Sequence, residues 1–306
     1  GKYEESLKYY QQAFAMQRVF YPDNHPNIAS SLNDIGIVYS SLGQPQEALK
    51  YLSQAFEMRQ ALYKGNHIDI ASSLNNLGIV YEALGKYEES LKYHQQAFEM
   101  RQTLYTGNHP DIAMSLNHLG KVYKHLRKYE EALKYCKQAL YMRQALYKDN
   151  HIDIADSLNN LGIVCGALGK YEESLKYYQQ AFAMQRIFYP DNDPAIAGSL
   201  SNLGDVCRDL GKYEEALEYY RQALYTRQAL YKGNHPYIAN TLNSIGTVYR
   251  DLGKSQEAMK YYQDALKMFW TLYPNKTDHP DIQKVRRNIE KLKEEQQEAE
   301  QNHPRK

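Results

Sequence analysis

Six histidines recur at one position of a long sequence period, and they are the residues best suited to bind a metal. They are His25, His67, His109, His151, His235 and His279. If each belongs to a separate stacked repeat, neighbouring members lie about 8–10 Å apart, whereas zinc needs its ligand nitrogens about 2.1 Å from one centre. Asp193 stands where a further histidine is due, and aspartate is common at helix starts. The row therefore predicts helix capping and no metal site.

Nucleophilic chemistry has little support in the sequence. Cys165 and Cys207 stand where other repeats carry tyrosine, and no base recurs beside them, so we interpret both as core residues. The sequence has no Gly-rich phosphate loop and no HExxH, CxxC or GxSxG motif. Asn275-Lys276-Thr277 matches a glycosylation site, but no secretion signal is visible, so we interpret it as a chance match. We expect no catalytic residue, no cofactor and no enzyme.

Composition narrows the classes of partner. Among 306 residues, 37 Lys and Arg nearly balance 36 Asp and Glu, and the net charge of +1 argues against nucleic acid, which requires a basic face. The rows of tyrosine are explained by repeated packing rather than by a nucleic-acid stacking groove. Apolar runs are too short to span a membrane. Three scattered cysteines fit a reducing compartment, which predicts a cytoplasmic protein.

These residues belong to a motif of 42 residues that is repeated seven times. Units start at Gly1, Gly43, Gly85, Arg127, Gly169, Gly211 and Gly253, and residues 1–18 are identical to residues 169–186. In the first unit, Tyr3, Leu7, Tyr10 and Phe14 recur at intervals of three and four, which predicts an amphipathic helix over 3–20. A second helix is expected from about Asn27 to the stop at Gly43.

Small residues at fixed positions predict close contact between these helices. Alanine recurs at Ala13, Ala55, Ala97, Ala139, Ala181, Ala223 and Ala265, and glycine at Gly36, Gly78, Gly120, Gly162, Gly204 and Gly246. A glycine inside a helix costs roughly 1 kcal/mol relative to alanine. Six at one position therefore require a structural reason, and the simplest is close approach of a neighbouring helix.

The order Leu74, Leu77-Gly78, Val80-Tyr81, Gly85, Glu89 and Ala97 resembles the tetratricopeptide repeat, in the 42-residue form of kinesin light chains. This resemblance implies an all-α fold, a right-handed α-solenoid (superhelix) of stacked antiparallel helix pairs. We expect a single array over 1–294, with a capping helix at about 281–294 and a polar, frayed tail over 295–306. The chain opens on the second helix of a unit, so we expect it to be a fragment of a longer array.

An asparagine row defines the candidate site. It comprises Asn33, Asn75, Asn117, Asn159 and Asn243, with Ser201 as the exception. In tetratricopeptide and kinesin light chain families, asparagines at this position line a concave groove and hold the backbone of an extended peptide, and the resemblance implies the same here. A ladder that bonds only to neighbouring helices is the alternative, and the sequence leaves both open.

Positions four and seven residues after the asparagine vary between units. The first set is Ile37, Ile79, Lys121, Ile163, Asp205 and Thr247, and the second is Ser40, Glu82, Lys124, Gly166, Arg208 and Arg250. Among them we add Ile79, Lys121, Lys124, Arg208 and Arg250 to the candidate site. Such variation is typical of peptide recognition, although neutral drift on a solvated face would look similar. The middle of the groove predicts a peptide with an acidic residue beside an apolar one.

Two functions from different classes follow. The first is a protein–protein interaction module that binds a peptide or protein segment in the concave groove. The alternative is a structural spacer or self-associating scaffold, joined through the exposed ends of the array, with no specific peptide ligand. Close similarity between units favours the alternative to some extent, because recent duplication extends a scaffold without refining a site.

Overall fold

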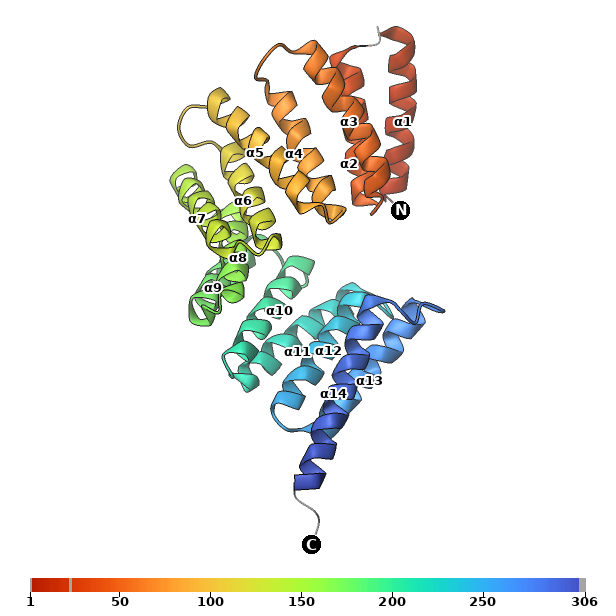
Figure 1. The fold of residues 1–306 in the computed structure, drawn as a ribbon, viewed down its shortest axis with the longest axis vertical. Coiled ribbons are helices and arrows are strands. Elements are labelled where there is room, and N and C mark those ends of the chain that lie inside the picture. Colours follow the sequence, from red (N-terminus) through yellow and green to blue (C-terminus); the bar gives the residue numbers. More distant parts are fainter. Residues whose placement is uncertain (1, 22–23, 303–306) are drawn as a thin grey trace. The chain divides into compact units, whose positions relative to one another are not determined.

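The computed structural model of the chain describes residues 2–21 and 24–302, and it contains fourteen helices and no strand in that part of the chain (Figure 1). The helices are α1 (Lys2–Phe20), α2 (Pro26–Ser41), α3 (Pro45–Leu62), α4 (Ile68–Ala83), α5 (Tyr87–Leu104), α6 (Pro110–His125), α7 (Tyr129–Leu146), α8 (Ile152–Ala167), α9 (Tyr171–Phe188), α10 (Pro194–Asp209), α11 (Tyr213–Leu230), α12 (Pro236–Asp251), α13 (Ser255–Leu272) and α14 (Pro280–Asn302). None of these helices is long and apolar enough to cross a membrane.

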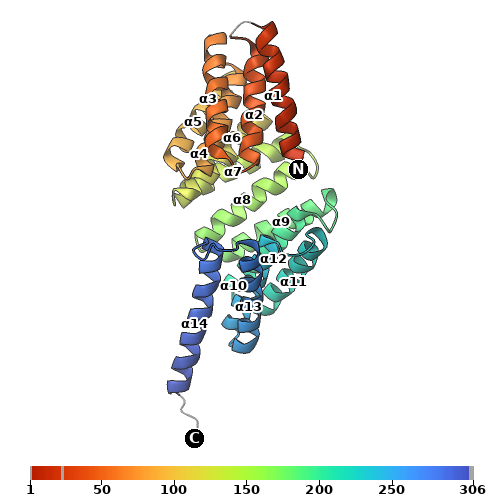
Figure 2. The same cartoon turned by 90° about the vertical axis from the view of Figure 1, so that its right-hand side faces the viewer.

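The chain forms two compact units, Gly1–Asp149 and Asn150–Lys306. Within each unit the helices lie side by side in chain order (Figures 1 and 2). We call α2, α4, α6, α8, α10 and α12 the first helices of the repeats, and the helix after each of them its second helix; α1 is also of the second type. Each first helix packs most closely against the second helix that follows it. The expected α-solenoid of stacked helix pairs is confirmed.

Each pair is joined by a tight turn. Gly43 occupies it with φ at +70°, a conformation that glycine adopts without steric cost. Arg127 takes the same place in the fourth 42-residue repeat, at φ +59°, where a residue with a side chain adopts the left-handed backbone conformation. The sequence therefore places the turns correctly, including the one without glycine.

The glycine row lies where the two helices of a pair touch. A Cβ on Gly162 would lie 2.7 Å from Cε1 of Tyr178, and one on Gly204 would lie 2.8 Å from Cε1 of Tyr220. Carbon atoms normally approach to about 3.5–4.0 Å. The residues that face the six glycines are Leu52, His94, Cys136, Tyr178, Tyr220 and Tyr262. The predicted close contact is confirmed, and it holds for side chains of very different size.

The histidine row caps the helices that follow it. In each of the six histidines, Nδ1 accepts a hydrogen bond from the backbone N–H two residues later, at 3.1–3.3 Å. The Oδ1 atom of Asp193 accepts the same bond from Ala195 at 2.8 Å. An imidazole can accept at Nδ1 only when the proton of the neutral ring is on Nε2. The row is therefore a set of N-caps, as the aspartate substitution indicated.

The last helix covers the apolar face of the final pair. Ile282, Val285 and Leu292 of α14 are buried in one cluster with Phe269 of α13. The helix begins at Pro280 but continues to Asn302, well past the expected end near 294. Residues 295–302 are mostly Glu, Gln and Ala, which have high helix propensity. The expected frayed tail is therefore helical as far as Asn302, and its remaining residues, 303–306, lie outside the described residues.

We predict that Gly204→Ala lowers the urea midpoint of unfolding, because the new methyl group has to displace the buried ring of Tyr220. Overpacking of this kind costs about 1–3 kcal/mol, which exceeds the roughly 1 kcal/mol gained in helix propensity. Gly198 of the same helix is the control. A methyl group at Gly198 would have no neighbour within 4 Å among the described residues outside its own helix backbone, so Gly198→Ala should raise the urea midpoint. Equal stabilisation by both substitutions would contradict the close-contact explanation.

Candidate functional site

The asparagine row lies on the first helices, and most of its side chains are buried. Asn33, Asn75, Asn117 and Asn243 are 3–8% exposed, and Asn159 is half-buried. These positions therefore lie largely within the fold rather than fully on the surface. Burial makes hydrogen bonding obligatory for their amides, because a buried polar group without a partner costs about 1–3 kcal/mol.

Two members of the row bond to a neighbouring first helix or to the capping helix. Asn76 of α4 donates from Nδ2 to Oδ1 of Asn33 at 2.9 Å. Asn288 of α14 donates in the same way to Oδ1 of Asn243, also at 2.9 Å. The ladder that the sequence left open therefore exists at these two positions.

Asn75 differs from these two. Its Oδ1 atom is buried and has no hydrogen-bond partner among the described residues. The position equivalent to Asn76 in the next repeat is His118, whose ring stacks on His94 at a centroid distance of 4.8 Å. In the second unit, Oδ1 of Asn159 is likewise buried without a partner in the described part of the chain. These two buried carbonyl oxygens are therefore unsatisfied within the described part of the chain.

Beside Asn75 the surface is apolar and then charged. Ile79, one turn further along α4, is 36% exposed. Nζ of Lys121 lies 2.8 Å from Oε1 of Glu82, whose side chain is only 11% exposed. Lys121 therefore already has a carboxylate partner within the protein, which the sequence argument overlooked although it named both positions. Its charge is not free for a ligand.

Lys124 is the remaining cation of this face. It is half-buried, and burial, followed by the nearby charge of Lys121, lowers the pKa of its ammonium group. His125 stacks on Tyr87 at 4.7 Å and lies 3.6 Å from Glu82. Burial, followed by the charge of Lys124, lowers the pKa of His125. With one carboxylate, two ammonium groups and a histidine that burial keeps neutral, the face of α4 and α6 carries one net positive charge.

The arginines predicted for the second unit are also paired. Arg208 lies 2.7 Å from Asp209, and Arg250 lies 2.8 Å from Asp251. The Arg250 side chain is only 13% exposed and lies 4.0 Å from Glu295 of α14. Asp205 accepts a hydrogen bond from the Tyr220 hydroxyl at 2.5 Å, and burial raises the pKa of its carboxyl group. This face offers matched pairs of charges rather than free cations.

A stacked histidine pair lies beneath the face of the first unit. His94 is fully buried against Gly78, and neither ring nitrogen has a hydrogen-bond partner among the described residues. Burial lowers the pKa of His94 to about 2 and that of His118 to about 4. Both rings are therefore neutral near pH 7. The signal in the sequence was that His94 stands at the repeat position of Leu52 and Cys136, which face the glycine row in their own pairs.

Buried arginines form a second feature that sequence analysis missed. Arg59 donates to the carbonyl of Asp69 at 3.1 Å and to the Ser73 hydroxyl at 2.8 Å. Arg101 makes the equivalent bonds to Asp111 and Ser115, at 3.2 and 2.7 Å. Each guanidinium thus ties a second helix to the start of the next first helix. The 42-residue recurrence of arginine with a serine 14 positions later could have revealed it.

We predict that acid destabilises the protein partly through His94. An unfolded histidine binds a proton near pH 6.5, whereas folded His94 stays neutral down to about pH 2, so the stability it confers is present above pH 6.5 and is lost as pH falls. Each such group contributes a slope of roughly 1.4 kcal/mol per pH unit. His94→Leu, which copies Leu52 of the preceding repeat, should flatten the loss of urea midpoint between pH 6.5 and 4. An unchanged slope would contradict this role.

The sequence matches the tetratricopeptide repeat family over overlapping segments that cover most of the chain. The matched residues are 1–61, 42–103, 69–133, 111–187 and 195–269. No curated protein matches the sequence.

Several solved structures share the fold. One is a kinesin light chain-like protein of Podosopora anserina with nearly identical TPR-like repeats, which is 21% identical to this chain. The match covers 68% of this chain and 99% of that chain, with a TM-score of 0.57. BtubC (BKLC) from P. vanneervenii is 19% identical, with 75% and 92% covered and a TM-score of 0.65. RapI in its apo form is 15% identical, with 89% and 93% covered and a TM-score of 0.64. Together with the sequence match and the helix pairs, these likenesses lead to one conclusion: the chain belongs to the tetratricopeptide repeat family.

Proposed function

We propose that the protein is an interaction scaffold that binds an extended peptide segment of a partner protein along the first helices α2, α4 and α6. The observation that carries this proposal is the buried Oδ1 atom of Asn75, which has no partner among the described residues. Binding would have to move the side chains that cover this oxygen, and a backbone N–H of the bound peptide would then supply the missing hydrogen bond. The protein would then recover part of the roughly 1–3 kcal/mol that an unsatisfied buried acceptor costs.

The neighbouring side chains define the kind of peptide. Ile79 offers apolar surface one turn from Asn75, so it would contact an apolar side chain of the ligand. Because Lys121 is paired with Glu82, the net positive charge beside it comes from Lys124. A carboxylate near Lys124 would gain about 1 kcal/mol or less and would bind more weakly at high salt. We therefore propose a ligand with an apolar residue beside an acidic one.

The proposed role is binding rather than catalysis, and it needs no cofactor. Cys136, Cys165 and Cys207 are all buried thiols, which suits a reducing compartment. We accordingly propose a cytoplasmic location for the protein.

A self-associating scaffold is the second candidate function. The close similarity between repeats favours it, because recent duplication extends a scaffold without refining a site, and residues 1–18 are identical to residues 169–186.

The peptide proposal can be tested with a ligand selected on the full chain from a random peptide display library. Its affinity, measured by fluorescence anisotropy, should fall about ten-fold in Asn75→Ala, corresponding to roughly 1.4 kcal/mol. Lys124→Glu should weaken binding of an acidic ligand and reduce its salt dependence. Lys134→Glu, an exposed lysine of α7, is the matched control and should bind normally. Selected ligands that bind both groove variants as tightly as the unchanged protein would contradict the proposal.

The second candidate has a separate measurement. Light scattering after size-exclusion chromatography, over a series of concentrations, should show a mass of 35.6 kDa throughout if the chain is a monomeric binding module. A mass that rises with concentration would favour the self-associating scaffold.

A further inference from the structure

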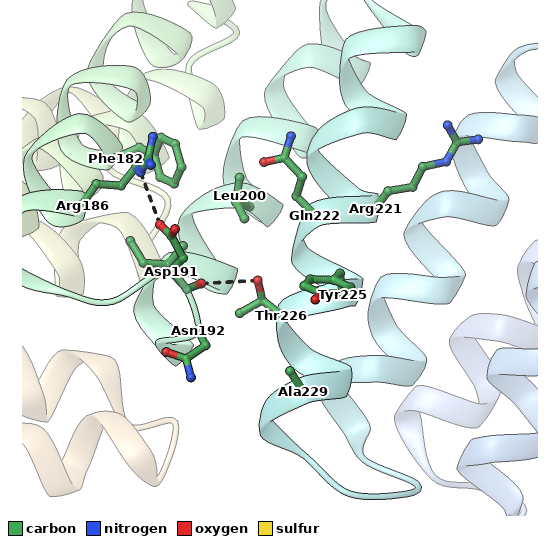
Figure 3. Close-up of a pocket in the computed structure, with 11 residues that line it drawn as sticks. Phe182, Arg186, Asp191, Asn192, Leu200, Arg221, Gln222, Tyr225, Thr226 and Ala229 are labelled. Atoms are coloured by element: carbon green, nitrogen blue, oxygen red, sulfur yellow. Dashed lines mark hydrogen bonds and ion pairs between the residues drawn. The ribbon is translucent and has the colours of Figure 1, made fainter.

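Crevices between successive second helices form a surface distinct from the asparagine row. In the second unit, a crevice of about 530 Å³ lies between α9 and α11 above the start of α10. Figure 3 shows Phe182 and Arg186 on one side, Tyr225 on the other and Leu200 between them. Ile196 completes the apolar floor.

The first unit contains the same crevice twice, with the same kind of floor. One of about 520 Å³ lies between α5 and α7 over Phe98, Ile112 and Leu116, and one of about 380 Å³ lies between α3 and α5 over Phe56, Ile70 and Leu74. The three sites are therefore equivalent in construction, and they differ mainly at the rim.

Tyrosine marks the rim of the two larger crevices. Tyr141 and Tyr225 occupy equivalent positions and are 74% and 77% exposed, which is unusual for so large an aromatic side chain. The smaller crevice carries Glu99 at this position. An exposed ring above a floor of Phe, Ile and Leu gives a second apolar group a face on which to stack.

The charges of the rims follow the same division. Lys137 is the single charged side chain among the described residues that line the crevice of Tyr141. Arg186 and Arg221 line that of Tyr225, against one carboxylate, Asp191, which lies 3.5 Å from Arg186. Arg221 extends away from Leu200 and donates to the Tyr249 hydroxyl at 2.8 Å (Figure 3). The residues that line each tyrosine crevice thus sum to one net positive charge, from Lys137 in the first and from Arg221 at the edge of the second, whereas those of the crevice of Glu99 sum to one negative charge.

We propose that the crevices of Tyr141 and Tyr225 are binding sites for a partner segment that presents an aromatic side chain next to an acidic residue. The aromatic side chain would lie on the Phe, Ile and Leu floor against the tyrosine ring. The carboxylate would complement the net positive rim. The side chains of Arg186 and Asp191 are both exposed, so their ion pair is weak. Arg186 can therefore leave Asp191 and pair with a carboxylate of the ligand. This inference does not depend on the asparagine row.

The test uses the full chain with labelled isoleucine methyl groups, because each crevice contains one isoleucine. Capped acetyl-Glu-Phe-Glu-amide is the probe, titrated while the methyl signals of Ile70, Ile112 and Ile196 are followed by NMR. Ile112 and Ile196 should shift in a saturable manner, and Ile70 should not. Acetyl-Glu-Ser-Glu-amide and acetyl-Lys-Phe-Lys-amide should bind at least five-fold more weakly.

Variants assign the response to the rim. Tyr225→Glu, which copies Glu99, should abolish the shift of Ile196 and leave that of Ile112. Arg186→Gln, which copies Gln102 of the first unit, should weaken binding at Ile196 about two- to five-fold. Lys124→Glu should change neither signal, which separates this site from the proposed groove. An absent response at Ile112 and Ile196, an equal response at Ile70, or an unchanged response in Tyr225→Glu would overturn the proposal.

Discussion

The close contact between a glycine of each first helix and the side chain that faces it is the constraint on which the rest of the structure depends. At Gly120 a Cβ would lie 2.5 Å from Sγ of Cys136, and at Gly246 it would lie 2.7 Å from the ring of Tyr262. No side chain fits on the glycine itself, so the backbone of the first helix lies directly against the facing side chain of the second helix. The same glycine-to-side-chain contact is thereby repeated from pair to pair.

This repeated contact also fixes the direction in which the other residues of each first helix point. Once the glycine faces the second helix, the asparagine three residues earlier meets the next first helix, and the residue after the glycine faces outward. Asn33 and Asn243 then bond to neighbours, whereas Asn75 does not, because His118 replaces the donor and stacks on His94. The change to His118 thus removes the donor that would face Asn75, although Oδ1 of Asn159 also lacks a partner in the described part of the chain.

The sequence predicted the parts of the structure that follow from period and spacing. The helix pairs, the turns, the glycine contacts and the helix caps all depend on local pattern, and all are confirmed. It could not predict that Glu82 pairs with Lys121, because that ion pair depends on the stagger between two helices 39 residues apart in sequence. The length of α14 was missed for a different reason: its polar end has helix propensity but no apolar stripe. The crevices arise between non-consecutive helices, where sequence periodicity carries little information.

The central claim is that the absent methyl group at each glycine sets the distance between paired helices. A double-mutant cycle on Gly120→Ala and Cys136→Ala tests it most directly. The first change adds a methyl group on α6, and the second removes the sulfur atom of α7 with which that methyl group would clash. Alone, Gly120→Ala should be destabilising, and in the Cys136→Ala background it should be nearly neutral, with a coupling energy in urea unfolding of about 1 kcal/mol or more. Strictly additive effects of the two substitutions would contradict the account.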